Sequence, residues 1–333
     1  MHDIKKIGLL GEGAYARIYL AEDSSGLKFA LKEYSLDKGN EEELRIYHKA
    51  ESAIYQKELS NNVVKLYGLW EENKKLCLLF EYCEYGCMKH QLKEKGPFDL
   101  RRTLKVGISV LNALESLHGE NIIHRDIKPH NILQGRNGVL KLADLGLAKI
   151  EGNKELKHAH GSVAYISPEQ YLDYNNVDER SDIYSLGATL FQLYTGKELY
   201  TGKDLDDILD SHQNCIVPNL RQFRSDCPLS FNHVLRKMVA KKPADRYQTA
   251  LEARKDLEKI FEGSKTIREL PSIQTFKEKV DEDSRKLSPP NEKQDESQDI
   301  ANLQRQDLRQ KKVIIASLVI SVVLVLSLIF LKN

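Results

Sequence analysis

The chain has 333 residues, of which 41% are hydrophobic, and its formal net charge at pH 7 is +1. This length and apolar content allow one large or two ordinary domains with a sizeable core, and the balanced charge provides no basic field of the kind that argues for nucleic-acid binding. Five cysteines, an odd number without paired CxxC spacing, argue against a disulfide framework or a zinc site and favour a reducing compartment.

The N-terminal part of the chain carries the patterns of β-strands. The stretches LKFALKEY (27–34) and KKLCLLFEY (74–82) alternate β-favouring side chains near turn residues, which predicts a strand in each. Between them, residues 41–59 have helical spacing of apolar side chains and contain no Gly or Pro. Gly11 and Gly13, in GEGAYARIYLA, would permit close approach of the backbone to a phosphate, although such a pair alone is typical of a tight turn.

Beyond Phe98 the pattern becomes helical. Apolar residues recur three and four positions apart in residues 100–118, 181–196 and 204–212, and each stretch predicts a helix. A small β-rich lobe followed by a larger α-rich lobe is therefore the predicted architecture, which belongs to the α+β class.

A polar segment, IIHRDIKPHNIL (122–133), stands between two apolar pairs in the helical part. Burying so many charged and polar groups is costly unless each is paired or has a chemical task. Two other residues invite the same question, since Lys32 lies in a predicted strand and Asp144 follows the apolar strand VLKLA, where a carboxylate could hold a divalent cation. Alone, Lys32 is typical of a surface lysine and Asp144 of a turn, so the order and spacing of the motifs carry the argument.

In that order and spacing, the motifs resemble those of a eukaryotic-type serine/threonine protein kinase over residues 4–262. The most specific match is HRDIKPHN (124–131), which corresponds to the catalytic-loop pattern H-R-D-x-K-x-x-N. The resemblance implies a bilobal kinase fold, with an N-lobe of about residues 4–80 and a C-lobe of about residues 81–262. It also implies ATP and Mg²⁺ as cofactors and protein Ser or Thr side chains as substrates.

Catalytic roles follow from the same resemblance. Asp126 would accept or orient the proton of the substrate hydroxyl, and Lys128 would neutralise the transferred phosphoryl group. Ser162, in GSVAY, would contact both residues and help to hold the acceptor. Lys32 would bind the α- and β-phosphates and pair with a glutamate on the next helix, which a count back from the following strand identifies as Glu51.

The resemblance also implies the nucleotide and metal sites. Asn131 and Asp144 would hold magnesium, and Phe80 takes the gatekeeper position. Backbone groups of Glu81 and Cys83 would meet the adenine, and Cys87 would lie at the rim of the nucleotide site. The implied ATP-binding residues are Gly11, Gly13, Ile18, Ala30, Lys32, Glu81, Cys83 and Cys87.

Three further residues would support the loop and the substrate platform. Glu169, in SPE, should pair with Arg246, and Asp182 should cap the catalytic loop from a central helix. The chain departs from the family pattern at four positions, where it carries Ala16, Leu145, Ser167 and Tyr184. None of these changes removes a charge that phosphoryl transfer needs.

Two functions remain open on the sequence: an active kinase, and a catalytically silent pseudokinase that acts as a membrane-tethered scaffold. The residues whose loss commonly marks a pseudokinase are all present, namely Lys32, Asp126, Asn131 and Asp144. Activation raises a separate question, because residues 145–161 contain no Ser, Thr or Tyr that could carry a phosphate for Arg125. Glu151 or Glu155 is predicted to supply that anion instead.

The C-terminal residues differ in character from the rest. Residues 263–312 are rich in charge, Ser and Gln, which predicts a solvated, disordered linker. Residues 313–331 carry no charge and, as a helix of ~28 Å, would nearly cross the ~30 Å core of a bilayer. Because Lys311 and Lys312 precede this stretch, a single-pass membrane protein with its N-terminal kinase domain in the cytoplasm is predicted. The sequence leaves the oligomeric state open.

Overall fold

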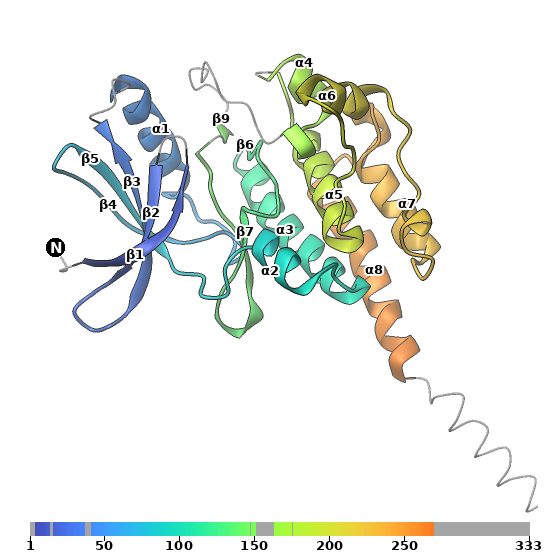
Figure 1. Ribbon diagram of the computed structural model, residues 1–333, viewed down its shortest axis with the longest axis horizontal. Coiled ribbons are helices and arrows are strands. Elements are labelled where there is room, and N and C mark those ends of the chain that lie inside the picture. The colour runs from blue at the N-terminus through green and yellow to red at the C-terminus, as the bar shows by residue number, and fades with distance from the viewer. Residues whose placement is uncertain are drawn as a thin grey trace, which may run out of the picture. The chain divides into compact units, whose positions relative to one another are not determined.

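A five-stranded antiparallel sheet and one helix form the N-terminal lobe (Figure 1). The computed structural model describes residues 4–13, 16–36, 41–146, 148–150, 163–174 and 176–269. The strand order is β1-β2-β3-β5-β4. The elements are β1 (Lys5–Glu12), β2 (Ala16–Glu22), β3 (Lys28–Ser35), α1 (Glu41–Ile54), β4 (Leu66–Glu72) and β5 (Lys75–Glu81).

The pairing of β3 with β5 determines which side chains lie on the face of the sheet that α1 covers. Strands β3 and β5 pair so that Ala30 lies opposite Phe80 and Lys32 lies opposite Leu78. Helix α1 covers one face of the sheet, where Leu44 joins a cluster of buried residues that includes Leu78 and Phe80. The alternation of side chains along β3 therefore places Lys32 and Tyr34 on the face that α1 covers.

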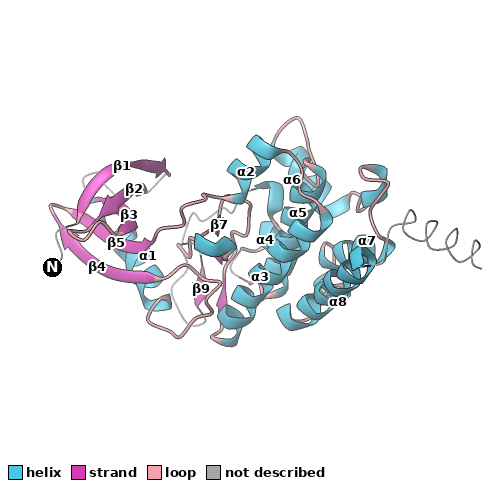
Figure 2. Cartoon of the chain, turned by 90° about the horizontal axis from the view of Figure 1, so that it is seen from below, coloured by secondary structure: helices cyan, strands magenta, loops and turns pink. Residues whose placement is uncertain are grey.

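Helices form the C-terminal lobe around a central, buried helix (Figure 2). Every residue from Ser181 to Tyr194 in that helix, α5, is buried, and α3 packs along both α5 and α8. The helices are α2 (Met88–Lys95), α3 (Leu100–Gly119), α4 (Pro168–Leu172), α5 (Arg180–Thr195), α6 (Leu205–Asn214), α7 (Leu229–Met238) and α8 (Ala250–Glu269).

Short strands and 3₁₀ turns frame the polar segment between the lobes. The strand pairs are β6 (Ile122–Ile123) with β9 (Lys149–Ile150) and β7 (Ile132–Gln134) with β8 (Leu140–Leu142). The apolar residues Ile122, Ile127 and Ile132 are buried in the C-lobe core. Ile122 and Ile132 anchor the polar loop at its two ends, as the flanking apolar pairs predict, and Ile127 anchors it in its middle, which was not predicted.

The predicted elements are confirmed, with two differences in their limits. Helix α1 ends at Ile54 rather than near residue 59, because the bonds from Gln56 N to Ala53 O and from Lys57 N to Ile54 O tighten the chain into a turn. Helix α8 continues to Glu269, past the predicted domain limit at residue 262. Gly263 lies inside it, since one exposed glycine costs a helix only about 1 kcal/mol.

The predicted membrane span, residues 313–331, lies outside the described residues, as does the linker from residue 270 onward. Within the described part of the chain, no helix combines the length and the apolar character that crossing a bilayer requires.

Candidate active site

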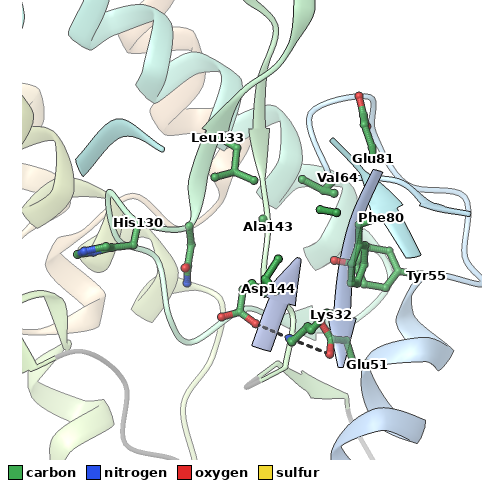
Figure 3. Close-up of a pocket in the computed structure, with 13 residues that line it drawn as sticks. Lys32, Glu51, Tyr55, Val64, Phe80, Glu81, His130, Leu133, Ala143 and Asp144 are labelled. Atoms are coloured by element: carbon green, nitrogen blue, oxygen red, sulfur yellow. Dashed lines mark hydrogen bonds and ion pairs between the residues drawn. The ribbon is translucent and has the colours of Figure 1, made fainter. Parts of the chain in front are cut away.

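A cleft between the two lobes collects eight of the residues that the sequence singles out (Figure 3). It encloses about 590 Å³ of non-protein space, a volume that includes its open mouth. The lining residues are Ile18, Ala30, Lys32, Glu51, Tyr55, Val64, Phe80, Glu81, His130, Asn131, Leu133, Ala143 and Asp144.

A partly buried ion cluster lies in the wall of the cleft. Lys32 Nζ lies 3.0 Å from both carboxylate oxygens of Glu51 and 2.9 Å from Asp144 Oδ1, so one cation joins strand β3, helix α1 and the C-lobe (Figure 3). Burial alone would lower the pKa of Lys32, but the two carboxylates raise it well above its usual value. The charge of Lys32 in turn lowers the pKa of Asp144 to about 2. The predicted pairing of Lys32 with Glu51 is confirmed.

Two residues beside the ion cluster, Tyr34 and Gly146, had no predicted role. Tyr34 Oη donates a hydrogen bond of 2.6 Å to Glu51 Oε2. A Cβ on Gly146 would stand 3.4 Å from Asp144 Oδ1 and 3.6 Å from Lys32 Nζ, which is ordinary van der Waals contact, so Gly146 lies directly beside the ion cluster. Leu145, between Asp144 and Gly146, is buried in the large core cluster of the C-lobe, which also includes Ile54 of α1.

The polar loop after β6 brings three more functional groups together. Lys128 Nζ lies 2.6 Å from Asp126 Oδ2, and Asn131 Nδ2 donates to the same oxygen at 3.0 Å and to the Asp126 carbonyl at 2.8 Å. The backbone is strained on both sides of the site, because Arg125 has a φ of 64° and Asp144 a φ of 66°. Such strain is characteristic of functional sites whose surroundings hold the backbone in place.

Asp182 of α5 fixes the backbone of this loop. Its carboxylate accepts hydrogen bonds from the backbone N–H of His124 at 2.9 Å and of Arg125 at 2.8 Å, and it lies 2.9 Å from His118 Nε2. Burial alone would raise the pKa of Asp182, but His118 and His124 lower it. The predicted cap on the loop is confirmed, and it explains how Arg125 keeps an unfavourable backbone conformation.

A second buried ion pair fixes the region that follows residue 162. Arg246 donates to both oxygens of Glu169, at 2.6 and 2.7 Å, which confirms the predicted pair. The Arg246 guanidinium lies 4.8 Å from the Tyr184 ring centroid, and Tyr184 Oη lies 2.8 Å from His212 Nδ1. Sequence reasoning noted Tyr184 as a departure but missed His212, whose position on α6 is set by tertiary packing alone.

The Protein kinase domain model matches residues 4–257 of the chain. The chain belongs to the protein kinase family. The Lys32–Glu51 ion pair has the form of the pair between a strand lysine and a helix glutamate that protein kinases use.

Bacterial serine/threonine kinases are among its relatives. Serine/threonine-protein kinase PrkC of Bacillus subtilis is 32% identical over 77% of the chain, and a protein named probable serine/threonine-protein kinase in Clostridium perfringens is 36% identical over 75%. Serine/threonine-protein kinase PknL of Mycobacterium tuberculosis is 34% identical over 60%. The matched regions are 40%, 37% and 51% of these proteins, so the kinase spans about two-fifths to one-half of their length.

The outer part of the kinase cleft suits a flat, apolar ring. Ile18 and Ala30 line it from the sheet, and Leu133 and Ala143 line it from the C-lobe. Phe80 closes the inner end, with its ring 5.2 Å from the ring of Tyr55. Among these, Leu133 and Ala143 were not predicted, because nothing in their local sequence distinguishes them from other core residues.

The remaining predicted nucleotide contacts lie near the cleft but do not line it. Gly13 N donates to Ala16 O at 2.8 Å, which closes the glycine turn, and Gly11 sits in β1 opposite Ile18. Cys83 is buried, and burial raises the pKa of its thiol to about 12, so any nucleotide contact would use its backbone. Cys87 is half-buried at the start of α2. These contacts stay predictions.

The charged residues fit a nucleotide-bound magnesium ion. Among the described residues, no three His, Cys, Asp or Glu side chains gather as a metal site. Magnesium commonly uses one or two protein carboxylates and completes its shell with phosphate oxygens and water. The Asn131 amide oxygen and the Asp144 carboxylate, both in the cleft wall, match that requirement. Ser162, Glu151 and Glu155 lie outside the described residues.

Proposed function

We propose that this chain is an active serine/threonine protein kinase that transfers the γ-phosphoryl group of ATP to Ser and Thr hydroxyls of protein substrates. The observation that carries the proposal is the arrangement of five groups in one site. Lys32, Glu51 and Asp144 form the ion cluster, and Asp126 and Lys128 pair on the loop beside it. Phosphoryl transfer depends mostly on positioned charge, and this is the arrangement that it needs.

Each residue has a task that follows from its surroundings. Asp126 is held by Asn131 and Lys128, so its carboxylate is oriented to accept the hydroxyl proton of a substrate. Lys128 pairs with that acid, and its charge would offset the negative charge that develops on the transferred group. Lys32 would bind phosphate oxygens while Glu51 keeps it in place. A bound magnesium ion, held by Asn131 and Asp144, would neutralise phosphate charge.

The alternative is a pseudokinase that binds nucleotide without turnover. The two are separated by transfer of labelled phosphate from ATP to the protein or to a peptide, with and without Mg²⁺. Asp126→Asn should lower the rate by about 100- to 10,000-fold, the usual contribution of a general base. Asp226→Asn, a surface change beside Arg224, is the control and should leave the rate unchanged. Equal transfer by the wild type and Asp126→Asn would rule out the assigned base.

We also propose that residues 313–331 anchor the kinase to the cytosolic face of a membrane. The uncharged stretch and the preceding Lys311 and Lys312 support this proposal. Deletion of residues 313–333 should release the protein from membranes and leave peptide phosphorylation in solution nearly unchanged. A truncated protein that still resisted alkaline carbonate extraction, or that lost activity in solution, would contradict this division of roles.

A further inference from the structure

Tyr34 stands on strand β3 two positions after Lys32, so both side chains project from the same face of the sheet. Only 3% of Tyr34 is exposed. Its hydroxyl donates to Glu51 Oε2 at 2.6 Å, and Lys32 Nζ lies 5.2 Å from the centroid of its ring. The Glu51 carboxylate therefore accepts hydrogen bonds from two residues of one strand, and only one of them is the lysine.

The ring of Tyr34 also contacts α1 at a second place. It meets the His48 ring edge to face, with centroids 6.3 Å apart. His48 precedes Glu51 by three residues, so both lie on the same side of the helix. Tyr34 belongs to the same buried cluster as Leu44, one turn earlier still. One tyrosine thus contacts the sheet-facing side of α1 over successive turns.

The hydrogen bond has a fixed direction. Burial, reinforced by the neighbouring Glu51 carboxylate, raises the pKa of Tyr34 well above its usual value. The phenol therefore stays protonated and donates, while Glu51 accepts. A hydrogen bond to a charged group is among the stronger ones, and it exists only while Glu51 points toward β3.

We propose that Tyr34 is a positioning residue that holds α1 and Glu51 in the arrangement that pairs with Lys32, so that the cleft is assembled without a phosphate on residues 145–161. This inference rests on the proposed kinase activity. Its second support is the sequence of that segment, which has no Ser, Thr or Tyr to modify. A bond made in only one of two positions of α1 shifts the equilibrium toward that position by its own free energy.

The test replaces Tyr34 with phenylalanine in the full chain, which removes the hydroxyl and keeps the ring. Tyr34→Phe should lower kcat/KM for ATP about 10-fold, the effect of losing one charged hydrogen bond. Tyr247→Phe is the matched control, because Tyr247 is 2% exposed and its hydroxyl donates to the Asp256 carboxylate at 2.9 Å, away from the cleft. The control should lose similar thermal stability and keep its kcat/KM.

A double-mutant cycle with Glu51→Gln tests whether Tyr34 acts through Glu51. In the Glu51→Gln background, Tyr34→Phe should have little further effect on kcat/KM or on the affinity for a non-hydrolysable ATP analogue. Activity of Tyr34→Phe equal to that of Tyr247→Phe, or a full 10-fold loss that persists in the Glu51→Gln background, would overturn the inference. If the wild type bound the analogue and transferred no phosphate, the proposed function would fail, and the affinity cycle would still test Tyr34.

Discussion

Two buried ion pairs of this kinase are built from different partners. Arg246 donates to Glu169 and also to three backbone carbonyls, those of Ala240, Arg180 and Lys241. Lys32 of strand β3 instead donates hydrogen bonds to two side chains, Glu51 of helix α1 and Asp144 of the C-lobe. The Arg246–Glu169 pair is therefore held by the backbone of the C-lobe, whereas Lys32 would, in the proposed function, exchange a carboxylate oxygen for a phosphate oxygen.

This difference distinguishes a structural ion pair, Arg246–Glu169, from a working ion pair, Lys32–Glu51. All five N–H groups of the Arg246 guanidinium have acceptors, so nothing that enters the cleft can improve on that arrangement. Lys32 faces the cleft together with Asp144, which is exposed, and its partners depend on where α1 and the C-lobe stand. The partners of Lys32 therefore depend on the positions of α1 and of the C-lobe. A shift of either element would change these partners, and such shifts are a common means of regulation.

The largest effect should come from breaking the structural pair. Arg246→Leu should lower the free energy of unfolding by about 3–5 kcal/mol, because it leaves the partly buried Glu169 carboxylate without its partner. Lys32→Met should cost less stability and should remove nucleotide binding instead, since Asp144 is exposed to water and the buried Glu51 keeps its hydrogen bond from Tyr34. Urea denaturation of both variants checks this ranking. Equal losses of stability would break the distinction between the two pairs.

A smaller effect is expected on the pH dependence of the stability of the C-lobe. Burial first, and then the charge of Lys241, lower the pKa of His212 to about 4, from an ordinary value near 6.5. Because the folded pKa is depressed, its contribution to stability is complete above about pH 6.5 and is lost as the pH falls toward 4. The expected loss between pH 7 and pH 5 is about 2 kcal/mol.

His212→Gln tests this source of pH dependence, because glutamine can still bond to the Tyr184 hydroxyl at His212 Nδ1's position but does not titrate. The variant should show a flatter stability curve between pH 7 and pH 5 than the wild type. Parallel curves for the two proteins would show that another group causes the acid sensitivity.

The smallest effect concerns chemical labelling of the cleft rim. Burial raises the pKa of Cys77 to about 11 and that of Cys83 to about 12, and it also raises the pKa of Cys227. Cys87, half-buried at the start of α2, should therefore react with an acrylamide-bearing hinge binder, and ATP should slow the reaction. Cys215 is exposed and serves as an internal control that ATP does not protect. Peptide mapping that found Cys215 modified instead, or no protection of Cys87, would place Cys87 away from the rim.

Local motifs predicted the parts of the site that depend on local chain geometry. The catalytic loop, Lys32 and Asp182 occupy fixed places in short patterns, and Glu51 follows by counting from a strand. The bond between Tyr34 and Glu51 could not be predicted this way, because it joins a strand to a helix whose mutual position depends on packing. The pairing of Tyr184 with His212 was not predicted for the same reason, although Tyr184 is one of the four departures from the family pattern and was the available signal.

The end of α8 was misjudged for a different reason. Residues 262–269 are mostly polar, and composition alone could not separate the end of a helix from a linker. Packing of the earlier turns against α3 extends the helix beyond its apolar part, since propagation adds a hydrogen bond for each residue.

The most direct test of this account is phosphoryl transfer by the full chain after complete phosphatase treatment. The dephosphorylated kinase, incubated with labelled ATP and Mg²⁺, should phosphorylate peptides that carry Ser or Thr acceptors at the same initial rate as the untreated protein. Matched Tyr peptides should remain unlabelled. A lag, or a large loss of initial rate that reverses as the protein phosphorylates itself, would contradict the claim that the ion cluster of Lys32, Glu51 and Asp144 is assembled by the fold alone.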